Sequence, residues 1–205
     1  MKGGVEVIWA LCVACLALGG ISLAVAADPE QVCKTDSIWA STPTAEFVDN
    51  GDGTVTHRRT GLTWMRCSLG QTWDGKGCNG EAKGHLWKQA LQAAADLNAS
   101  GGYAKRADWR VPNIKELDSI AELQCAWPAI NLTIFPGTPP KRFWSSSLFM
   151  QKNFRWAMFV SFQDGYTDDG RVGDPDRAEE AVLKFSYPVR LVRGGDDFDS
   201  LNQRR

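Results

Sequence analysis

The chain of 205 residues carries a formal net charge of −1, and 23% of its residues are charged. Nucleic acids and anionic membranes attract proteins with an excess of positive charge, so this balance predicts neither as a partner. The length that remains after an N-terminal export segment is enough for one domain with a sizeable hydrophobic core.

The N-terminus has the pattern of a secretory signal peptide. Lys2 precedes an apolar run over residues 7–25, which ends in the small residues 24–27. We expect residues 1–27 to be a cleaved signal peptide. The alternative is an uncleaved membrane anchor, because the run is long for a signal peptide. The protein is therefore expected to be secreted, periplasmic or at the cell surface, with membrane contact only during export.

Four cysteines remain after this segment: Cys33, Cys67, Cys78 and Cys125. An even number in an oxidising compartment predicts two disulfides, for which three connectivities are possible. Cys67 and Cys78 enclose a short glycine-rich loop and favour a local pair, which would leave Cys33 to join Cys125. A zinc site is the alternative. Because the remaining chain has no CxxC motif and its two histidines are isolated, we expect no metal and no cofactor.

The first half of the chain predicts a tether, a hairpin and a helix. Residues 28–44 are expected to form an N-terminal tether held by Cys33. Residues 46–56 show the alternation of side chains that is typical of strands and contain Asn-Gly and Asp-Gly pairs, which predicts a β-hairpin. A further strand is expected over 60–67. Apolar side chains at helical spacing over 85–99, followed by Ser-Gly-Gly, predict a helix.

The sequence DWRVPNIKEL, residues 108–117, predicts a sharp corner and a second helix. Pro112 favours an extended backbone before it, and Asn113 with Glu116 three residues later matches a capping box. Apolar residues at helical spacing extend the expected helix over 113–124.

Polar residues at this corner could form a site, but we expect a structural role for them. Arg110 is predicted to pair with Glu116 or Asp108 beside a buried Trp109, because a partly buried arginine needs a carboxylate partner. The chain has nine tryptophans. They predict a core of large aromatic side chains, with an exposed sugar-binding surface as the alternative.

The second half of the chain predicts a sheet. Strands are expected over residues 143–147, 153–162, 182–185 and 187–195. The acidic, glycine-rich segment 164–180 is interpreted as a solvated loop, with calcium binding as the alternative. The tail, 196–205, is charged and expected to be flexible. Helices followed by a meander of strands predict an α+β fold.

Five separated motifs carry a family resemblance. They are "FVDNGDGTVT…TGLTWMRC", "DWRVPNIKEL", "PAIN…FPGTP", "FWSSS" with Trp144, and "YPVRLVRGG" with Arg190. In this order they resemble the Lcl C-terminal domain family, which includes the C-terminal domain of a bacterial collagen-like adhesin. The resemblance implies one domain over residues 45–195.

A more distant resemblance concerns the fold. "WRVPNIKEL" and "VRLVRGG" look like signatures of formylglycine-generating-enzyme-like domains. This resemblance implies a C-type-lectin-like fold, in which two helices flank a twisted antiparallel sheet. It does not imply the enzyme activity, because those enzymes work through cysteines late in the chain and this sequence has none after Cys125. The calcium-binding motifs of C-type lectins are also missing, since serines follow Trp144.

The expected function is binding rather than catalysis. Ser145, Ser146 and Ser147 lack the Gly-x-Ser-x-Gly context of a nucleophile. We expect a secreted, non-enzymatic module that recognises glycans, including sulfated or acidic polysaccharides, in adhesion. An assembly component that binds a partner protein is the alternative, and a diverged formylglycine-generating-enzyme-like enzyme is a third hypothesis. Charge-assisted hydrogen bonds to such glycans would come from a basic patch: Lys141, Arg142, Lys152 and Arg155.

Overall fold

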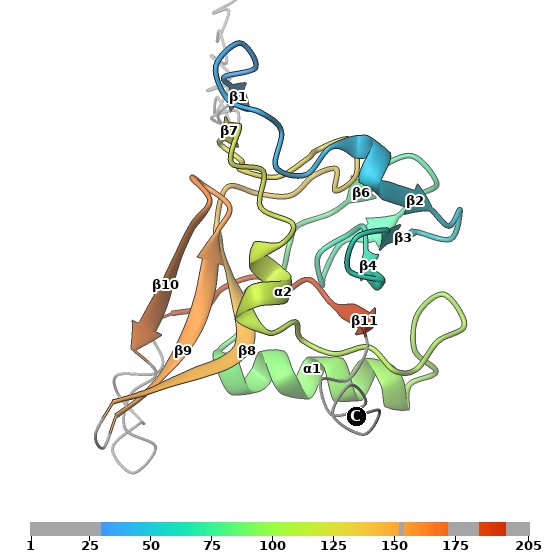
Figure 1. Cartoon of the computed structure of the whole chain (residues 1–205). Helices are drawn as coiled ribbons and strands as arrows, with labels where there is room; N and C mark the ends of the chain where they lie inside the picture. The colour runs from blue at the N-terminus through green and yellow to red at the C-terminus, as the bar shows by residue number, and fades with distance from the viewer. Residues whose placement is uncertain (1–29, 152–153, 172–184, 196–205) are drawn as a thin grey trace, which may run out of the picture.

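The computed structural model describes residues 30–151, 154–171 and 185–195 (Figure 1). Several predictions fall outside these residues. They concern the signal peptide, Lys152, the part of the acidic segment after residue 171, the start of the strand at 182–185 and the tail. The described residues form a mixed α/β structure with antiparallel sheets, two α-helices and two disulfides.

A four-stranded antiparallel sheet contains the predicted hairpin. Its strands lie in the order β11-β4-β3-β2, and their bounds are β2 Phe47–Asp49, β3 Thr54–His57, β4 Leu62–Met65 and β11 Val192–Gly194. Successive strand residues point to opposite faces, so Val55, Trp64 and Val192 fill the core while Thr56, Thr63 and Arg193 lie on the opposite face.

A three-stranded antiparallel sheet lies beside it, in the order β10-β9-β8. Its strands are β8 Arg142–Gln151, β9 Phe154–Ser161 and β10 Tyr166–Arg171. The prediction of a loop after residue 163 is therefore wrong for 166–171, which pair along β9. Tyr166 and Thr167 are residue types that favour strands, and Thr167 pairs with Val160 of β9. These features outweigh the acidic composition that suggested a loop.

The last strand joins a different sheet from the one we predicted. β11 pairs with β4 through Val192 and Trp64, instead of closing the β8–β10 sheet. The preceding residues still bridge the two sheets, because Met65 of β4 donates a backbone hydrogen bond to Leu191 and Trp144 of β8 donates one to Pro188. The strand period in the sequence identifies an extended segment but does not reveal which edge it will pair with.

The two helices pack on opposite sides of β8 and β9. α1 spans Trp87–Ala99, close to the predicted 85–99. Its Ala90 and Ala94 pack in one core cluster with Trp144, whereas the adjacent Phe143 belongs to the cluster that contains Leu117 of α2. Because neighbouring strand residues point to opposite faces, the two clusters place each helix on its own face of β8.

The second helix is much shorter than predicted. α2 covers only Ile114–Asp118, although its capping box is confirmed. Ser119 ends the helix, and its hydroxyl donates to the carbonyl of Glu116 at 2.6 Å. Such a side-chain hydrogen bond competes with the backbone hydrogen bonds that would continue the helix. Farther on, Ala121 bridges to Ile130, so the apolar residues after 118 pack in the core without continuing the helix.

Both disulfides have the connectivity that the spacing favoured. Cys67–Cys78 closes a loop that also holds the short hairpin of β5 (Thr72–Trp73) and β6 (Cys78–Asn79). Cys33–Cys125 joins β1 (Val32–Cys33) to β7 (Cys125–Ala126), which pair antiparallel. No helix of the described residues is long and apolar enough to cross a membrane.

Only the last part of the segment that we predicted as a tether packs on the domain, because residues 32–40 are exposed whereas Thr42 is buried. A short 3-10 helix, Thr44–Glu46, follows, and buried Glu122 holds Ser41 and Thr42. The Glu122 carboxylate accepts hydrogen bonds from the backbone and hydroxyl groups of Ser41 and Thr42, at 2.9 to 3.1 Å, and one from the backbone of Gln124 at 3.0 Å. Burial alone would raise the pKa of Glu122, but these hydrogen bonds outweigh it and lower the pKa.

Replacing Glu122 with glutamine is expected to destabilise the fold by about 2 kcal/mol at neutral pH, because an amide group would face donors that require an acceptor. The folded-state pKa lies below the unfolded one, so the stability that ionised Glu122 contributes is present above pH 4.5 and is lost as the pH falls through the folded pKa. Urea unfolding at a series of pH values measures the free energy of unfolding of wild type and of Glu122→Gln. The difference in this free energy between the two proteins should shrink in acid. A difference that stays constant would contradict the role of ionised Glu122. Exposed Glu81→Gln is the control.

Candidate functional site

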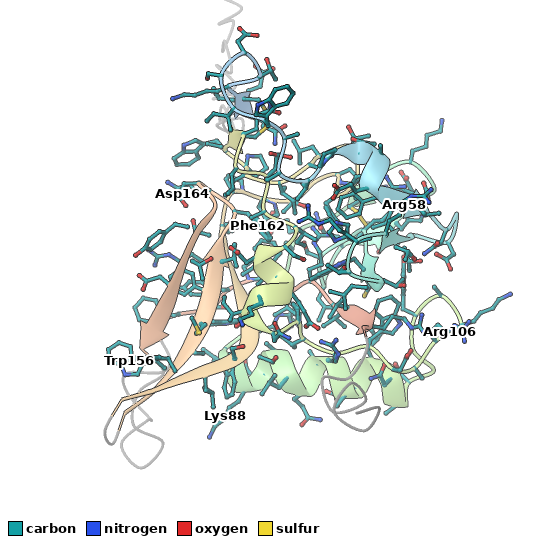
Figure 2. The ribbon with its side chains drawn as sticks, viewed as in Figure 1. Arg58, Lys88, Arg106, Trp156, Phe162 and Asp164 are labelled. Carbon is teal, nitrogen blue, oxygen red and sulfur yellow. A yellow bond between two sulfur atoms is a disulfide. The ribbon has the colours of Figure 1, made fainter. Side chains whose placement is uncertain are left out.

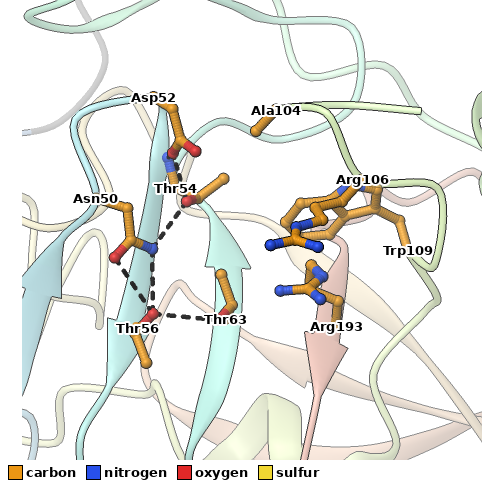
Figure 3. Close-up of a pocket in the computed structure, with 9 residues that line it drawn as sticks. All are labelled: Asn50, Asp52, Thr54, Thr56, Thr63, Ala104, Arg106, Trp109 and Arg193. Atoms are coloured by element: carbon orange, nitrogen blue, oxygen red, sulfur yellow. Dashed lines mark hydrogen bonds between the residues drawn. The ribbon is translucent and has the colours of Figure 1, made fainter. Parts of the chain in front are cut away.

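A polar groove lies over the outward face of the four-stranded sheet (Figure 3). Its volume is about 260 Å³, and its lining comes from the β2–β3 turn, the two central strands, the 103–109 segment and β11. The lining residues are Asn50, Asp52, Thr54, Thr56, Thr63, Ala104, Arg106, Trp109 and Arg193. The volume is below that typical of pockets for drug-sized ligands, so the groove fits a small polar group or one unit of a longer chain.

The floor of the groove is a row of hydroxyl and amide groups. Thr56 and Thr63 are directly opposed on β3 and β4, and their hydroxyls are 3.1 Å apart. The Asn50 amide donates to the hydroxyls of Thr54 and Thr56 at 2.9 and 3.1 Å. Asp52 accepts from the Thr54 backbone at 3.1 Å. This network fixes the orientation of the polar side chains before any ligand is present.

Two guanidinium groups form the opposite wall. Figure 3 shows Arg106 and Arg193 side by side, with both guanidinium groups directed toward the threonine row. Arg193 is paired with Asp108 at 2.8 Å. The hydrogen bond from Arg193 is the main cause of a lowered pKa of Asp108, and the charge of Arg106 adds to the effect. The carboxylate therefore stays ionised and balances one of two neighbouring cations.

The corner around Trp109 supports this wall. Trp109 is 2% exposed, as predicted. The side chain of Asn98 accepts from its backbone N–H at 3.0 Å and donates to its carbonyl at 2.7 Å. The Trp109 indole N–H donates to the Tyr103 carbonyl at 3.0 Å. The end of α1 thus fixes the segment that carries Arg106.

A clamp at the same corner fixes β11 and with it Arg193. Arg110 donates two hydrogen bonds to the Glu116 carboxylate at 2.7 and 2.8 Å, which confirms the first of its two predicted partners. The same guanidinium donates to the carbonyl of Gly194 at 2.9 Å. Glu116 also accepts from the backbone of Asn113, so one carboxylate caps α2 and anchors the strand.

A tight turn presents Arg106. Tyr103 and Arg106 exchange two backbone hydrogen bonds, and the two residues between them, Ala104 and Lys105, have φ angles of 51° and 60°. Positive φ at both central positions is the type I′ geometry, which normally uses asparagine and glycine. Non-glycine residues in this region cost about 1–3 kcal/mol each, and such conformations cluster at functional sites. Ala104 itself lines the groove.

The turn between β2 and β3 lies against the same segment. Gly53 has a φ of 85°, and an added Cβ would collide with the Tyr103 hydroxyl and lie 2.9 Å from Trp73. Only glycine fits this position. The close approach holds the Asn50–Thr54 side of the groove against the segment that carries Arg106.

Two of the four basic residues that we predicted as a ligand-binding patch lie far apart along the β8–β9 hairpin. Arg142 is opposite Ser161 at one end of the β8–β9 hairpin, whereas Arg155 is opposite Met150 near the other. Six residues of strand separate these positions, or about 20 Å. Lys152 lies outside the described residues. A role for each residue in ligand binding stays a prediction.

Lys141 and Arg142 are adjacent in the chain and both are exposed. Arg142 donates to the Tyr187 hydroxyl at 3.1 Å and stacks 4.9 Å from the centre of the Phe159 ring. Lys141 lines a second, wider groove of about 540 Å³ beside Pro128 and the 71–82 segment.

Trp144 and Arg190, which we predicted as structural residues, are both buried. Trp144 donates to the His85 carbonyl at 2.8 Å, and Arg190 is fully enclosed.

Metal binding and nucleophilic catalysis receive no positive support. Within residues 30–151, 154–171 and 185–195, no three His, Cys, Asp or Glu residues lie close enough to hold a metal ion. The Ser145 hydroxyl donates to the carbonyl of Met158 at 2.8 Å, as expected for a hydroxyl within a strand pair.

Comparison with protein families gives one match, over residues 53–193, to the Lcl C-terminal domain family. The chain belongs to this family. The matched region covers more than half of the chain and runs from Gly53 in the β2–β3 turn to Arg193 in the groove. Searches of the curated proteins and of the solved structures returned no significant match.

The sequence alone did not identify the groove as a site of this Lcl C-terminal domain. Its two arginines are 87 positions apart, and no pattern in the sequence links them. One local signal was available: in Val192-Arg193 the alternation of a strand places the arginine on the face opposite the core. The threonines of β3 and β4 follow the same rule, but only the strand register places them next to Arg193.

Proposed function

We propose that this Lcl C-terminal domain protein is an exported, non-enzymatic module that binds an acidic glycan through the Arg106–Arg193 groove. The observation that carries the proposal is the convergence of two guanidinium groups on a row of ordered hydroxyl and amide groups. Guanidinium groups bind carboxylate and sulfate through paired, charge-assisted hydrogen bonds. The threonine and asparagine side chains suit the hydroxyl groups of the same sugar.

The charge of the groove favours a sugar with a single acidic group. Arg106 and Arg193 face Asp52 across the groove, and Asp108 lies behind Arg193. The groove is therefore not a strongly positive surface of the kind that binds polyanions regardless of their structure. A uronic acid or a sulfated sugar offers both an anionic group for the arginines and hydroxyl groups for the polar floor.

The predicted fold and compartment agree with this proposal. Helices on opposite faces of β8 and β9 are in keeping with a C-type-lectin-like fold, which we include in the proposal. Two disulfides support an oxidising compartment outside the cytoplasm. Adhesion to an acidic polysaccharide is the role that we infer from these features together with the family resemblance.

Binding of the oxidised protein to uronic, sulfated and neutral glycans at two salt concentrations tests the proposal. We expect binding to the acidic glycans only, with weaker binding at high salt because ionic contacts are screened. Arg106→Gln with Arg193→Gln should weaken the binding by about a hundredfold, since each lost charged hydrogen bond costs roughly 1.5 kcal/mol. Arg59→Gln is the matched control, because Arg59 is 68% exposed and lies outside the groove.

A second pair of variants separates the two sets of cations. Lys141→Gln with Arg142→Gln tests the predicted basic patch in the same assay. If this pair abolishes binding and the groove variants do not, the site lies at the start of β8 and the groove assignment fails. If no glycan binds at all, the proposal fails and a partner protein becomes the favoured ligand.

A further inference from the structure

A cluster of exposed apolar side chains projects from the end of the domain opposite α1. β1 and β7 lie at the tip of this projection in Figure 1, and Figure 2 shows side chains extending from it on several sides. We call the cluster the apolar knob. Its members, with their exposed fractions, are Val32 (61%), Ile38 (40%), Trp39 (95%), Leu123 (58%) and Trp127 (40%).

The exposure of these residues is unusual for this chain. Trp64, Trp109 and Trp144 are all at most 2% exposed, and Trp73, Trp87 and Trp156 are partly buried, so Trp39 is far more exposed than these six tryptophans. A tryptophan that is 95% exposed gains nothing from folding, although its ring carries a large apolar surface. Clusters of exposed apolar residues on soluble domains mark surfaces that contact a membrane or another macromolecule.

The knob is held rigidly in its exposed arrangement. The Cys33–Cys125 disulfide joins its two strands. The Gln124 side chain donates to the Ile38 carbonyl, and the backbone of Trp127 donates to the Gln163 carbonyl at 2.8 Å. Trp127 has a φ of 57°, a left-handed conformation that is unfavourable for a bulky residue. A rigid frame therefore keeps these apolar side chains in water.

The position of the knob in the chain indicates what covers it. The apolar run over residues 7–25 ends only seven positions before Val32, and seven positions span at most about 25 Å. While that run lies in a bilayer as a retained anchor, the folded knob is held close to the bilayer surface. Tryptophan prefers this interface, where its ring is apolar and its N–H meets water.

The charge around the knob supports an apolar mode of binding. Exposed Lys34 and Asp36 lie between its strand and Trp39, and their charges cancel. The knob also projects, whereas sites for small ligands are concave.

From these observations we propose that the apolar knob inserts Trp39 and Trp127 into the interfacial layer of a lipid bilayer. This goes beyond the sequence prediction, which gave the membrane a role only during export, and it does not depend on the glycan proposal. In Figure 1 the projection lies apart from the four-stranded sheet, so a knob in contact with a membrane leaves the groove accessible.

Quenching of tryptophan emission by lipid tests the proposal on the complete oxidised chain. The protein is mixed with phosphatidylcholine vesicles whose acyl chains carry bromine, and unbrominated vesicles give the reference. We expect bromine to quench part of the emission, and Trp39→Phe to lower the quenched part because one inserted indole is lost. Trp9 lies in the apolar run and contributes equally to both proteins.

Matched variants make the result specific to the knob. Trp73→Phe changes a partly exposed tryptophan beside the groove and should leave the quenched emission unchanged. The quenching should also persist at high salt, because the knob binds through apolar contacts. If wild type and Trp39→Phe lose the same amount of emission to bromine, Trp39 does not lie in lipid and the proposal is overturned. Trp39 is almost fully exposed, so its replacement does not threaten folding.

Discussion

Replacing Arg190 with methionine is expected to lower the free energy of unfolding by about 3 kcal/mol. The Arg190 side chain is fully buried. Its guanidinium donates to the carbonyls of Met65 and Arg66, to the Ser68 hydroxyl at 3.3 Å and to the Thr138 hydroxyl at 2.6 Å. Methionine fills much of the space but leaves these acceptors without a donor in the core.

Two opposing effects set the size of this change. Burial lowers the pKa of Arg190 to about 9, so the side chain remains charged at neutral pH and its desolvation opposes folding. No carboxylate hydrogen-bonds to the guanidinium among the described residues. Methionine removes this desolvation cost. The lost hydrogen bonds still dominate, because each one to a charged group contributes roughly 1.5–3 kcal/mol.

Urea unfolding of Arg190→Met at neutral pH measures the effect. Arg59→Met is the matched control, since the Arg59 side chain is 68% exposed and its change should be within about 0.5 kcal/mol. An Arg190→Met protein as stable as wild type would show that charge burial cancels the hydrogen bonds. The guanidinium would then contribute specificity rather than stability.

Removal of the Cys33–Cys125 disulfide is expected to have an even larger effect. The two cysteines are 92 positions apart, and for such a loop the chain-entropy model predicts a loss of about 4.5 kcal/mol on replacement of both with alanine. The Cys67–Cys78 loop spans 11 positions, and its removal should cost about 3 kcal/mol. The hydrogen bonds from Ser41 and Thr42 to Glu122 remain in both variants.

Thermal and urea unfolding of the two double-alanine variants compares these costs directly. The long loop should give the larger loss, because the disulfide acts mainly by restricting the unfolded chain. Equal losses, or a larger loss for the short loop, would contradict this explanation. Local packing around Cys67, which is 2% exposed, would then be the dominant contribution.

Local sequence signals predicted local features well. The capping box of Asn113 and Glu116 could be found because its two halves are three residues apart. The ion pair of Arg110 with Glu116 is also local. The same holds for helix α1 and the β2–β3 hairpin, whose patterns lie within single segments.

Features that depend on long-range pairing could not be predicted. Apolar residues after Asp118 continue a helical period, but the bridge from Ala121 to Ile130 uses them in another way. The groove is built by contacts between residues up to 143 positions apart, from Asn50 to Arg193. The separation of Arg142 from Arg155 along the hairpin could not be predicted for the same reason, since it depends on the strand register.

The placement of the last described segment has a consequence for protein synthesis. Val189, Leu191 and Val192 lie in the two hydrophobic clusters, and Arg190 binds carbonyls in the first half of the chain. A ribosome must therefore complete almost the whole polypeptide before either cluster can close. Products that terminate before residue 189 would expose both clusters, and proteases that remove unfolded chains could recognise them. Only chains that extend through Val192 could complete both clusters.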